Sequence, residues 1–265
     1  MLTLEQLLIF YSSPIEKNIP KRNILIEYLQ YELLDSIYTQ EQSKYLSFMG
    51  GTSIRIGYGG TRFSEDLDFD NFRLTFDEFE ELMKKVVWHM NKKGFEIEFR
   101  FIAKGAYHCY IKFSKLLFES GISGYKGEKI LVRIDTVEKE KIFNPNIFTL
   151  NKFDLYRNIL INPPDIILSQ KLITILERKR EKGRDFYDVS FLYGKTEPNF
   201  RYIEKVIKLN KNEFAEKILK KCAQLNFKAL AKDVTPFLID PASAARVSDF
   251  ESFIRSKLGS NQGHH

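Results

Sequence analysis

Three aspartates, Asp66, Asp68 and Asp70, occupy alternate positions in the segment SEDLDFDNF. In an extended strand, side chains two residues apart project from the same face. The Cα atoms of two such residues lie roughly 6–7 Å apart, so their carboxylates are close enough to share one divalent ion. Oxygen ligands without a neighbouring histidine or cysteine suit Mg²⁺ or Mn²⁺. Asp66 and Asp68 therefore predict a metal site, and an acidic, solvated edge strand is the alternative.

A glycine doublet lies upstream of these aspartates, at Gly50 and Gly51, and Thr52 and Ser53 follow it. Such a turn frees backbone N–H groups and adds two hydroxyls, so that it can bind phosphate oxygens. A further carboxylate, Asp135, lies in the apolar segment ILVRIDTV, where an unpaired acid would be unfavourable without a cation. Three acids on two strands and a phosphate-binding turn predict a two-metal phosphoryl-transfer site.

Hydrophobic periodicity predicts the elements that carry these residues. Apolar residues at helical spacing after NIPKRN predict a first long helix. A second helix begins at Thr75, which forms a capping box with Glu78, and ends at Gly94. Strict alternation predicts strands in FEIEFRF, YHCYIKF and ILVRIDTV. The first part of the chain is therefore a mixture of helices and strands.

The chain changes character near residue 160. The segment NPPD predicts a helix that enters at Pro163, with Asn162 as its N-cap, and the segments that follow have helical periodicity. We therefore expect the α+β class, with a mixed sheet in a domain over residues 1–160 and a helical domain over residues 161–258. Residues 259–265, which end in two histidines, are interpreted as a tail left from a purification tag.

The composition argues against several classes of protein. Cys109 and Cys222 lack the spacing of a metal site or a disulfide framework, so we expect two reduced, packed thiols. No apolar run reaches the roughly 18 residues that a membrane-spanning helix needs. The amino-terminal segment lacks the features of a signal peptide, so we expect a cytoplasmic protein. The net charge of +6 is weakly in favour of anionic partners such as nucleotides or RNA.

The segment GGTSIRIGYGGTRFSEDLDF resembles the signature of the AbiEii/AbiGii-type toxin nucleotidyltransferases, which belong to the polymerase-beta-like nucleotidyltransferase superfamily. That superfamily has a small-residue doublet after a hydrophobic residue, two acids separated by one residue on the next strand, and a third acid on a later strand. Gly50 and Gly51 match the first element. Asp66 and Asp68 match the second element, and Asp135 matches the third. The resemblance implies a nucleotidyltransferase fold for the first domain and a helical domain that completes the cleft.

The segment LSQKLITILERKREKGRDFYDVSFL resembles the lysine-bearing helix of the same family and the Arg-Asp-x-x-Asp helix that follows it. The pattern alone favours Lys171 as a lysine that packs along an apolar stripe, whereas the resemblance implies that it reaches the triphosphate. Asp185 and Asp188 are either capping and first-turn acids or, as the resemblance implies for one of them, needed for activity, and we prefer Asp185 for that role. The basic run from Arg178 to Arg184 is either a solvated helix end or a phosphate- or RNA-binding patch.

The resemblance implies an enzyme that transfers a nucleoside monophosphate from an NTP to an acceptor, either the 3′ end of tRNA or a protein hydroxyl. Such an enzyme is the toxin of a type IV toxin–antitoxin or phage-defence (abortive infection) system, with its antitoxin encoded nearby. Asp66 and Asp68 would hold two Mg²⁺ (or Mn²⁺) ions, and Asp135 would bind one of them and orient the attacking hydroxyl. The residues expected to bind the nucleotide are Gly50, Gly51, Thr52, Ser53, Arg62 and Lys171.

Two alternatives use the same fold. One is a non-catalytic protein that binds nucleotide or RNA, and the other is a protein phosphotransferase that uses the same cleft. Asp70 has no counterpart in the family pattern, and we interpret it as an acid that solvates the end of its strand.

Overall fold

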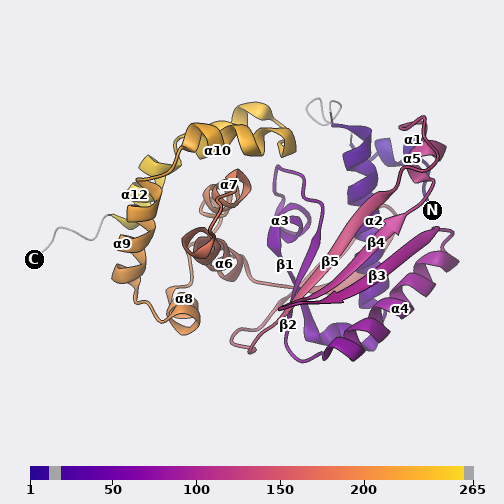
Figure 1. The fold of residues 1–265 in the computed structure, drawn as a ribbon, viewed down its shortest axis with the longest axis horizontal. Coiled ribbons are helices and arrows are strands. Elements are labelled where there is room, and N and C mark those ends of the chain that lie inside the picture. The colour runs from indigo at the N-terminus through magenta and orange to yellow at the C-terminus, as the bar shows by residue number, and fades with distance from the viewer. Residues whose placement is uncertain (12–18, 260–265) are drawn as a thin grey trace, which may run out of the picture. The chain divides into compact units, whose positions relative to one another are not determined.

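The computed structural model describes residues 1–11 and 19–259 (Figure 1). Apart from Gly259, the expected tail therefore lies outside the described residues. The chain divides into two compact units. The first, here called the α/β unit, contains residues 1–57 and 63–162. The second, here called the helical unit, contains residues 58–62 and the chain from Pro163 onward.

The α/β unit is built on a seven-stranded sheet with the strand order β3-β4-β5-β2-β1-β7-β6. The sheet is mixed, because β2 pairs with β5 and β1 pairs with β7 in parallel, whereas the other neighbours are antiparallel. This confirms the expected α+β class. The strands are β1 (Leu46–Met49), β2 (Leu67–Asn71), β3 (Ile97–Ala103), β4 (Tyr107–Phe113), β5 (Ile130–Glu138), β6 (Asn146–Lys152) and β7 (Leu155–Ile161).

Among the described residues, five α-helices belong mainly to this unit, and α2 and α4 pack against each other and against the sheet (Figure 1). In α4, the Thr75 hydroxyl accepts from the Glu78 N–H while the Glu78 side chain accepts from the Thr75 N–H, which confirms the predicted capping box. The helix stops just before Gly94, whose φ is +94°. The helices are α1 (Leu4–Leu8), α2 (Lys21–Tyr38), α3 (Gly50–Tyr58), α4 (Phe76–Lys92) and α5 (Leu116–Glu119).

The sheet also contains a hairpin, β6–β7, that the sequence patterns did not predict. Its two-residue turn, Phe153 and Asp154, has positive φ at both positions, which is the backbone that joins tightly paired strands. The Phe153 side chain is buried and packs edge-on against the rings of Tyr28 and Tyr31. The hairpin places β7 beside β1 and so extends the sheet.

The helical unit consists of α6 (Pro164–Glu177), α7 (Gly183–Leu192), α8 (Phe200–Ile207), α9 (Lys211–Cys222), α10 (Phe227–Val234), α11 (Ala245–Ser248) and α12 (Phe250–Leu258), with short 3₁₀ turns. Its core contains an aromatic cluster in which the ring of Phe186 lies 5.3 Å from that of Phe227 and 5.0 Å from that of Phe250. The segment 58–62 joins this unit through main-chain contacts, since Ile239 N–H donates to Thr61 O.

Both cysteines are buried and reduced, as expected. Burial raises the pKa of each thiol, Cys109 and Cys222, to about 12, so neither is a thiolate at neutral pH. Within residues 1–11 and 19–259, no helix combines the length and the hydrophobicity that a membrane span requires.

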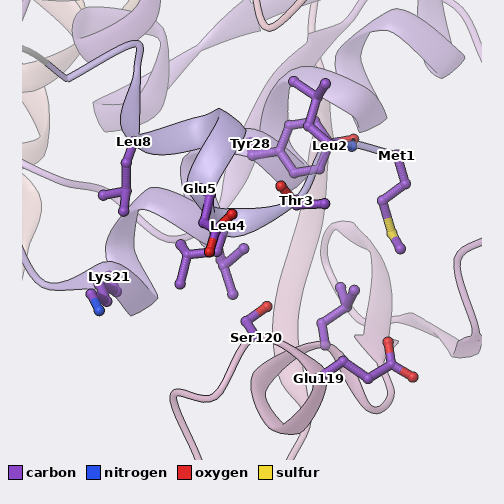
Figure 2. Close-up of a pocket in the computed structure, with 12 residues that line it drawn as sticks. Met1, Leu2, Thr3, Leu4, Glu5, Leu8, Lys21, Tyr28, Glu119 and Ser120 are labelled. Carbon is purple, nitrogen blue, oxygen red and sulfur yellow. Dashed lines mark hydrogen bonds between the residues drawn. The ribbon is translucent and has the colours of Figure 1, made fainter.

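A cavity of about 520 Å³ lies beside α1, the start of α2 and α5 (Figure 2). Tyr28 and Leu2 line it, and the Leu2 N–H donates to the Tyr28 hydroxyl at 3.0 Å. Its lining contains none of the predicted site residues. The cavity is therefore treated as a feature of the amino-terminal packing.

The interpretation of Asp70 as a solvated strand end is wrong. Asp70 is completely buried, because β2 lies between β5 and β1 in the interior of the sheet. Its Oδ1 lies 2.6 Å from Lys139 Nζ, and its Oδ2 accepts from Asn162 Nδ2 at 2.7 Å. Asn162 Oδ1 in turn accepts from Ser47 Oγ at 2.5 Å.

Asn162 is for the same reason not the N-cap that its position in NPPD predicted. Its side chain is engaged inside the sheet, and α6 begins after Pro163 without a side-chain cap. The proline at the first position of the helix lacks an N–H that would need a partner, so the cap is less necessary there.

Replacing Asp70 with alanine removes a buried carboxylate from Lys139 and Asn162. Because both partners lose their counterpart, we expect the free energy of unfolding to fall by roughly 2–4 kcal/mol. Urea denaturation measures this change. The control is Glu81→Ala, which removes an exposed ion pair with Lys85 and is expected to change stability by less than about 0.5 kcal/mol. Equal effects of the two substitutions would contradict the assigned role of Asp70.

Candidate functional site

Strand pairing brings the predicted carboxylates of the α/β unit together. Asp66 directly precedes β2, and Asp68 is the second residue of that strand. The parallel neighbour β5 places Asp135 opposite Asp68 in register. All three side chains are partly exposed, in contrast to the buried Asp70. The sheet therefore presents three accessible acids from two adjacent strands.

Arg133 lies among these three acids. Its Nη2 is 2.8 Å from Asp66 Oδ2, and its Nε is 2.8 Å from Asp135 Oδ2. Burial lowers the pKa of Arg133, but the attraction of Asp66, Asp135 and Asp68 outweighs it, so that the pKa is raised above its ordinary value. The guanidinium thus contributes positive charge that compensates these carboxylates.

His108 binds the other oxygen of Asp135. It lies opposite Asp135 on β4, and its Nδ1 is 2.7 Å from Asp135 Oδ1. Neither partner of Asp135 was predicted from the sequence. The alternation in VRID places Arg133 on the same face as Asp135 and could have indicated the first partner. No sequence signal could have indicated His108, because its position depends on the register of two strands.

The predicted phosphate-binding turn is the first turn of helix α3, which starts at Gly50 directly after β1. Gly50 has a φ of +78°, and a Cβ at this position would overlap with Asp68 Oδ2. The absence of a side chain therefore allows the Asp68 carboxylate to lie at the amino end of α3. The N–H groups in the first turn of a helix have no partner within the helix, and such an end favours anions.

The two hydroxyls of this turn are directed into the fold. Thr52 and Ser53 are completely buried. Thr52 Oγ1 donates to the main-chain oxygen of Asp66, and Ser53 Oγ donates to Gly50 O at 2.9 Å. The first of these bonds ties the amino end of α3 to the residue before β2. These hydroxyls therefore hold the turn against the acidic strand, and their contact with a nucleotide stays a prediction.

A second charged cluster lies in the helical unit. Lys171, on α6, places its Nζ 3.0 Å from Asp185 Oδ1 and 2.8 Å from Asp188 Oδ2, both on α7. Arg62 binds Asp188 at two points, through Nε and Nη2, each at 2.6 Å. Arg178 Nε lies 3.4 Å from Asp185 Oδ2. Three cations therefore surround two carboxylates.

Opposite charges keep Lys171 and Asp188 ionised although burial disfavours their charged forms. Burial lowers the pKa of Lys171, but the negative charges of Asp188 and Asp185 raise it by a larger amount, so the net shift is upward. Burial raises the pKa of Asp188, but the positive charges of Arg62 and Lys171 lower it by a larger amount, so the net shift is downward. The ammonium of Lys171 is thus bound by two acids rather than extended into solvent. Neither acid caps α7, since the N-cap is Lys182 without a side-chain bond.

Close helix packing fixes the two acids. A Cβ at Gly183, the first residue of α7, would overlap with the main-chain oxygen of Leu230 on α10. The Gly183 N–H donates to Asp233 Oδ2 at 2.8 Å. Because α7 is held at its first residue, Asp185 and Asp188 are placed at fixed positions within its first two turns.

Arg62, expected to neutralise phosphate charge, has a different partner in this structure. Its side chain is buried, and both ends of its guanidinium fork bind Asp188. The basic run that follows α6 is partly engaged in the same cluster through Arg178, whereas Lys179 and Arg180 are exposed.

A comparison with family models identifies the chain. The model for the nucleotidyl transferase AbiEii toxin of type IV toxin–antitoxin systems matches residues 32–256. The chain belongs to the AbiEii family. This confirms the resemblance seen in the sequence motifs, and membership in a toxin–antitoxin family implies an antitoxin partner. A comparison with curated protein sequences found no match.

Solved structures show that this AbiEii family member has a nucleotidyltransferase fold. It is similar to MenT4, a nucleotidyltransferase toxin from Mycobacterium tuberculosis, with a TM-score of 0.60, 15% identity, and coverage of 96% of this chain and 90% of MenT4. It is also similar to JHP933 from Helicobacter pylori, with a TM-score of 0.53, 17% identity, and coverage of 89% of this chain and 93% of JHP933. At these identities the similarity concerns the fold.

Replacing Gly50 with alanine tests the contact between α3 and Asp68. The added methyl group would overlap with the Asp68 carboxylate, so we expect a loss of stability about 1–3 kcal/mol greater than in the control. The control is Gly59→Ala, because Gly59 has a similar φ of +71° but open space around a Cβ. Urea denaturation of both variants separates the contact from the backbone strain that they share. Equal losses would show that the contact is unimportant.

Arg62→Met tests the buried pair with Asp188. Because Asp188 would keep only Lys171 as a partner, we expect the free energy of unfolding to fall by roughly 3–5 kcal/mol. Arg246→Met, on the exposed surface of α11, provides the control and should change stability by no more than about 0.5 kcal/mol. Chemical denaturation of both variants measures the difference. A loss for Arg62→Met as small as that of the control would contradict a structural role for Arg62.

Proposed function

We propose that this protein is a metal-dependent nucleotidyltransferase that transfers a nucleoside monophosphate from an NTP to an acceptor hydroxyl and releases pyrophosphate. The observation that carries this proposal is the arrangement of Asp68, which lies against Gly50 at the amino end of α3 and opposite Asp135 on β5. An anion-binding helix end beside paired carboxylates suits a substrate that is a complex of phosphate and metal.

The donor set of the α/β unit fits Mg²⁺ or Mn²⁺ in its chemistry. Asp66, Asp68 and Asp135 offer only oxygen ligands, and all three attract the same guanidinium, which supports a cluster that favours a cation. In the part of the chain that the structure describes, no three His, Cys, Asp or Glu side chains are arranged as a metal site. The assignment of the three aspartates therefore rests on the chemistry of their oxygen donors and not on their present arrangement. The three aspartates are the residues that would hold the ion, which would neutralise phosphate charge and activate the acceptor hydroxyl.

The remaining roles follow from charge. The first-turn N–H groups of α3 would bind phosphate oxygens, and Asp135, with His108 on its other oxygen, would orient the acceptor hydroxyl. Lys171 and Asp185, which bind each other, are proposed as the helical unit's contribution to activity, with a role for Lys171 toward the triphosphate that the family resemblance implies. Positioning and electrostatics carry such a transfer, so no serine or cysteine nucleophile is needed.

The biological setting we propose is that of a toxin acting in the cytoplasm under the control of its antitoxin. The acceptor is either the 3′ end of tRNA or a hydroxyl of a protein. Each α-labelled NTP, incubated with the protein, Mg²⁺ and total cell RNA or protein, identifies the base and the acceptor. γ-Labelled ATP in a parallel reaction distinguishes phosphotransfer, because label then comes from the terminal phosphate.

Asp68→Asn keeps the shape of the side chain and removes its charge. Since that charge would hold the metal and the phosphates together, we expect incorporation of α-label to fall by roughly 10²–10³-fold or more. The control is Asp77→Asn, in the first turn of α4, which should retain activity within about twofold. Incorporation by Asp68→Asn at the level of the control would refute the assignment, and NTP binding without any labelled product would favour a non-catalytic protein.

A further inference from the structure

Arg133 and Arg62 each make two contacts with carboxylates, but their side chains differ in exposure. The Arg62 guanidinium is buried, with a side chain that is 4% exposed, whereas the side chain of Arg133 is 36% exposed. A buried pair is expensive to break because it leaves an uncompensated charge, but a partly exposed guanidinium can exchange its carboxylate for water at low cost. Arg133 is therefore placed to leave its partners.

The contacts of Arg133 are also imperfect as hydrogen bonds. Its Nε lies 2.8 Å from Asp135 Oδ2, but this buried nitrogen makes no well-aligned hydrogen bond among the described residues. The Asp66 contact, from Nη2 at 2.8 Å, is a hydrogen bond. The guanidinium thus donates a hydrogen bond to Asp66 and forms an ion pair with Asp135. Charge attraction, rather than a well-aligned hydrogen bond, holds it close to Asp135.

Arg133 feels the charge of all three acids. Asp66, Asp135 and Asp68 each raise the pKa of its guanidinium, and it contacts two of them directly. Carboxylate oxygens that accept from a guanidinium are the same atoms that would coordinate a divalent ion. A divalent ion that binds at Asp66 Oδ2 and Asp135 Oδ2 would therefore compete with Arg133 for these two oxygens.

We propose that Arg133 is an internal counter-cation that a divalent ion must displace from Asp66 and Asp135. This inference rests on the proposed function, because it assumes that the three aspartates bind a metal ion. It makes Arg133 a residue that sets the metal affinity of the cluster. Without metal, Arg133 bridges Asp66 and Asp135, and metal binding weakens that bridge.

Two variants test this displacement without an activity measurement. Arg133→Gln removes the competing charge, so we expect Mn²⁺, measured as free ion by electron paramagnetic resonance without NTP, to bind at least about tenfold more tightly than in the wild type. Arg133→Lys keeps the charge but cannot bridge two acids with one compact ammonium, so its affinity should lie between these values. Unchanged or weaker Mn²⁺ binding by these variants would overturn the proposal.

Thermal unfolding in EDTA and in Mn²⁺ adds a second readout. Without Arg133 the acids repel one another, so Arg133→Gln should melt several degrees lower in EDTA and recover in Mn²⁺ more than the wild type does. Arg100→Gln is the matched control, since Arg100 lies over the ring of Tyr110 at 4.6 Å on the neighbouring strand and also loses one positive charge. An equal Mn²⁺ response of the two glutamine variants would show that net charge alone matters.

The two hypotheses fail in different ways. If the wild type incorporates α-label with Mg²⁺ but Arg133→Gln binds Mn²⁺ no more tightly, the counter-cation role is refuted and the proposed function stands. If the wild type incorporates no label while Arg133→Gln gains Mn²⁺ affinity and thermal recovery, the exchange of arginine for metal is supported and nucleotidyl transfer is refuted.

Discussion

Carboxylates that lie close together in a folded protein remain ionised only when positive charge compensates each of them. Strands β2 and β5 bring four carboxylates into one part of a sheet, where positive charge reaches them in three ways. Arg133 serves two of them, Lys139 pairs with Asp70, and the amino end of α3 faces Asp68. Two features of the fold serve this requirement. Gly50 lets the Asp68 carboxylate approach the amino end of α3, and the central position of β2 buries Asp70 beside Lys139.

The helical unit meets the same requirement by burial. Its two aspartates and the cations Lys171 and Arg62 are almost completely removed from water. A buried ion network contributes little net stability, although the loss of one member is severe. What the network provides is a defined position and a fixed charge for Lys171. In the α/β unit, by contrast, Asp66, Asp68 and Asp135 are partly exposed, which is the condition that a metal ion or a nucleotide needs in order to reach them.

Elements in which hydrophobic residues recur at a regular spacing could be predicted from the sequence. In α4, the capping box at Thr75 marks the start of the helix, and apolar residues at helical spacing mark its buried face. The β6–β7 hairpin could not, because Phe153 in its turn gives no signal for left-handed backbone. Asp68 could be selected from a local motif. The pair of Arg62 with Asp188 joins residues 126 positions apart, so it becomes visible only when the chain is folded. Pattern analysis identified acids, whereas their counter-charges depended on register and long-range packing.

Parallel pairing of β2 with β5 delays assembly of the carboxylate cluster during synthesis on the ribosome. Parallel neighbours need a crossover connection, and here it contains α4, β3 and β4. A nascent chain that has emerged only through Phe113 carries Asp66 and Asp68 but neither Arg133 nor Asp135. The carboxylate cluster is therefore incomplete until β5 has been translated and has emerged from the ribosome.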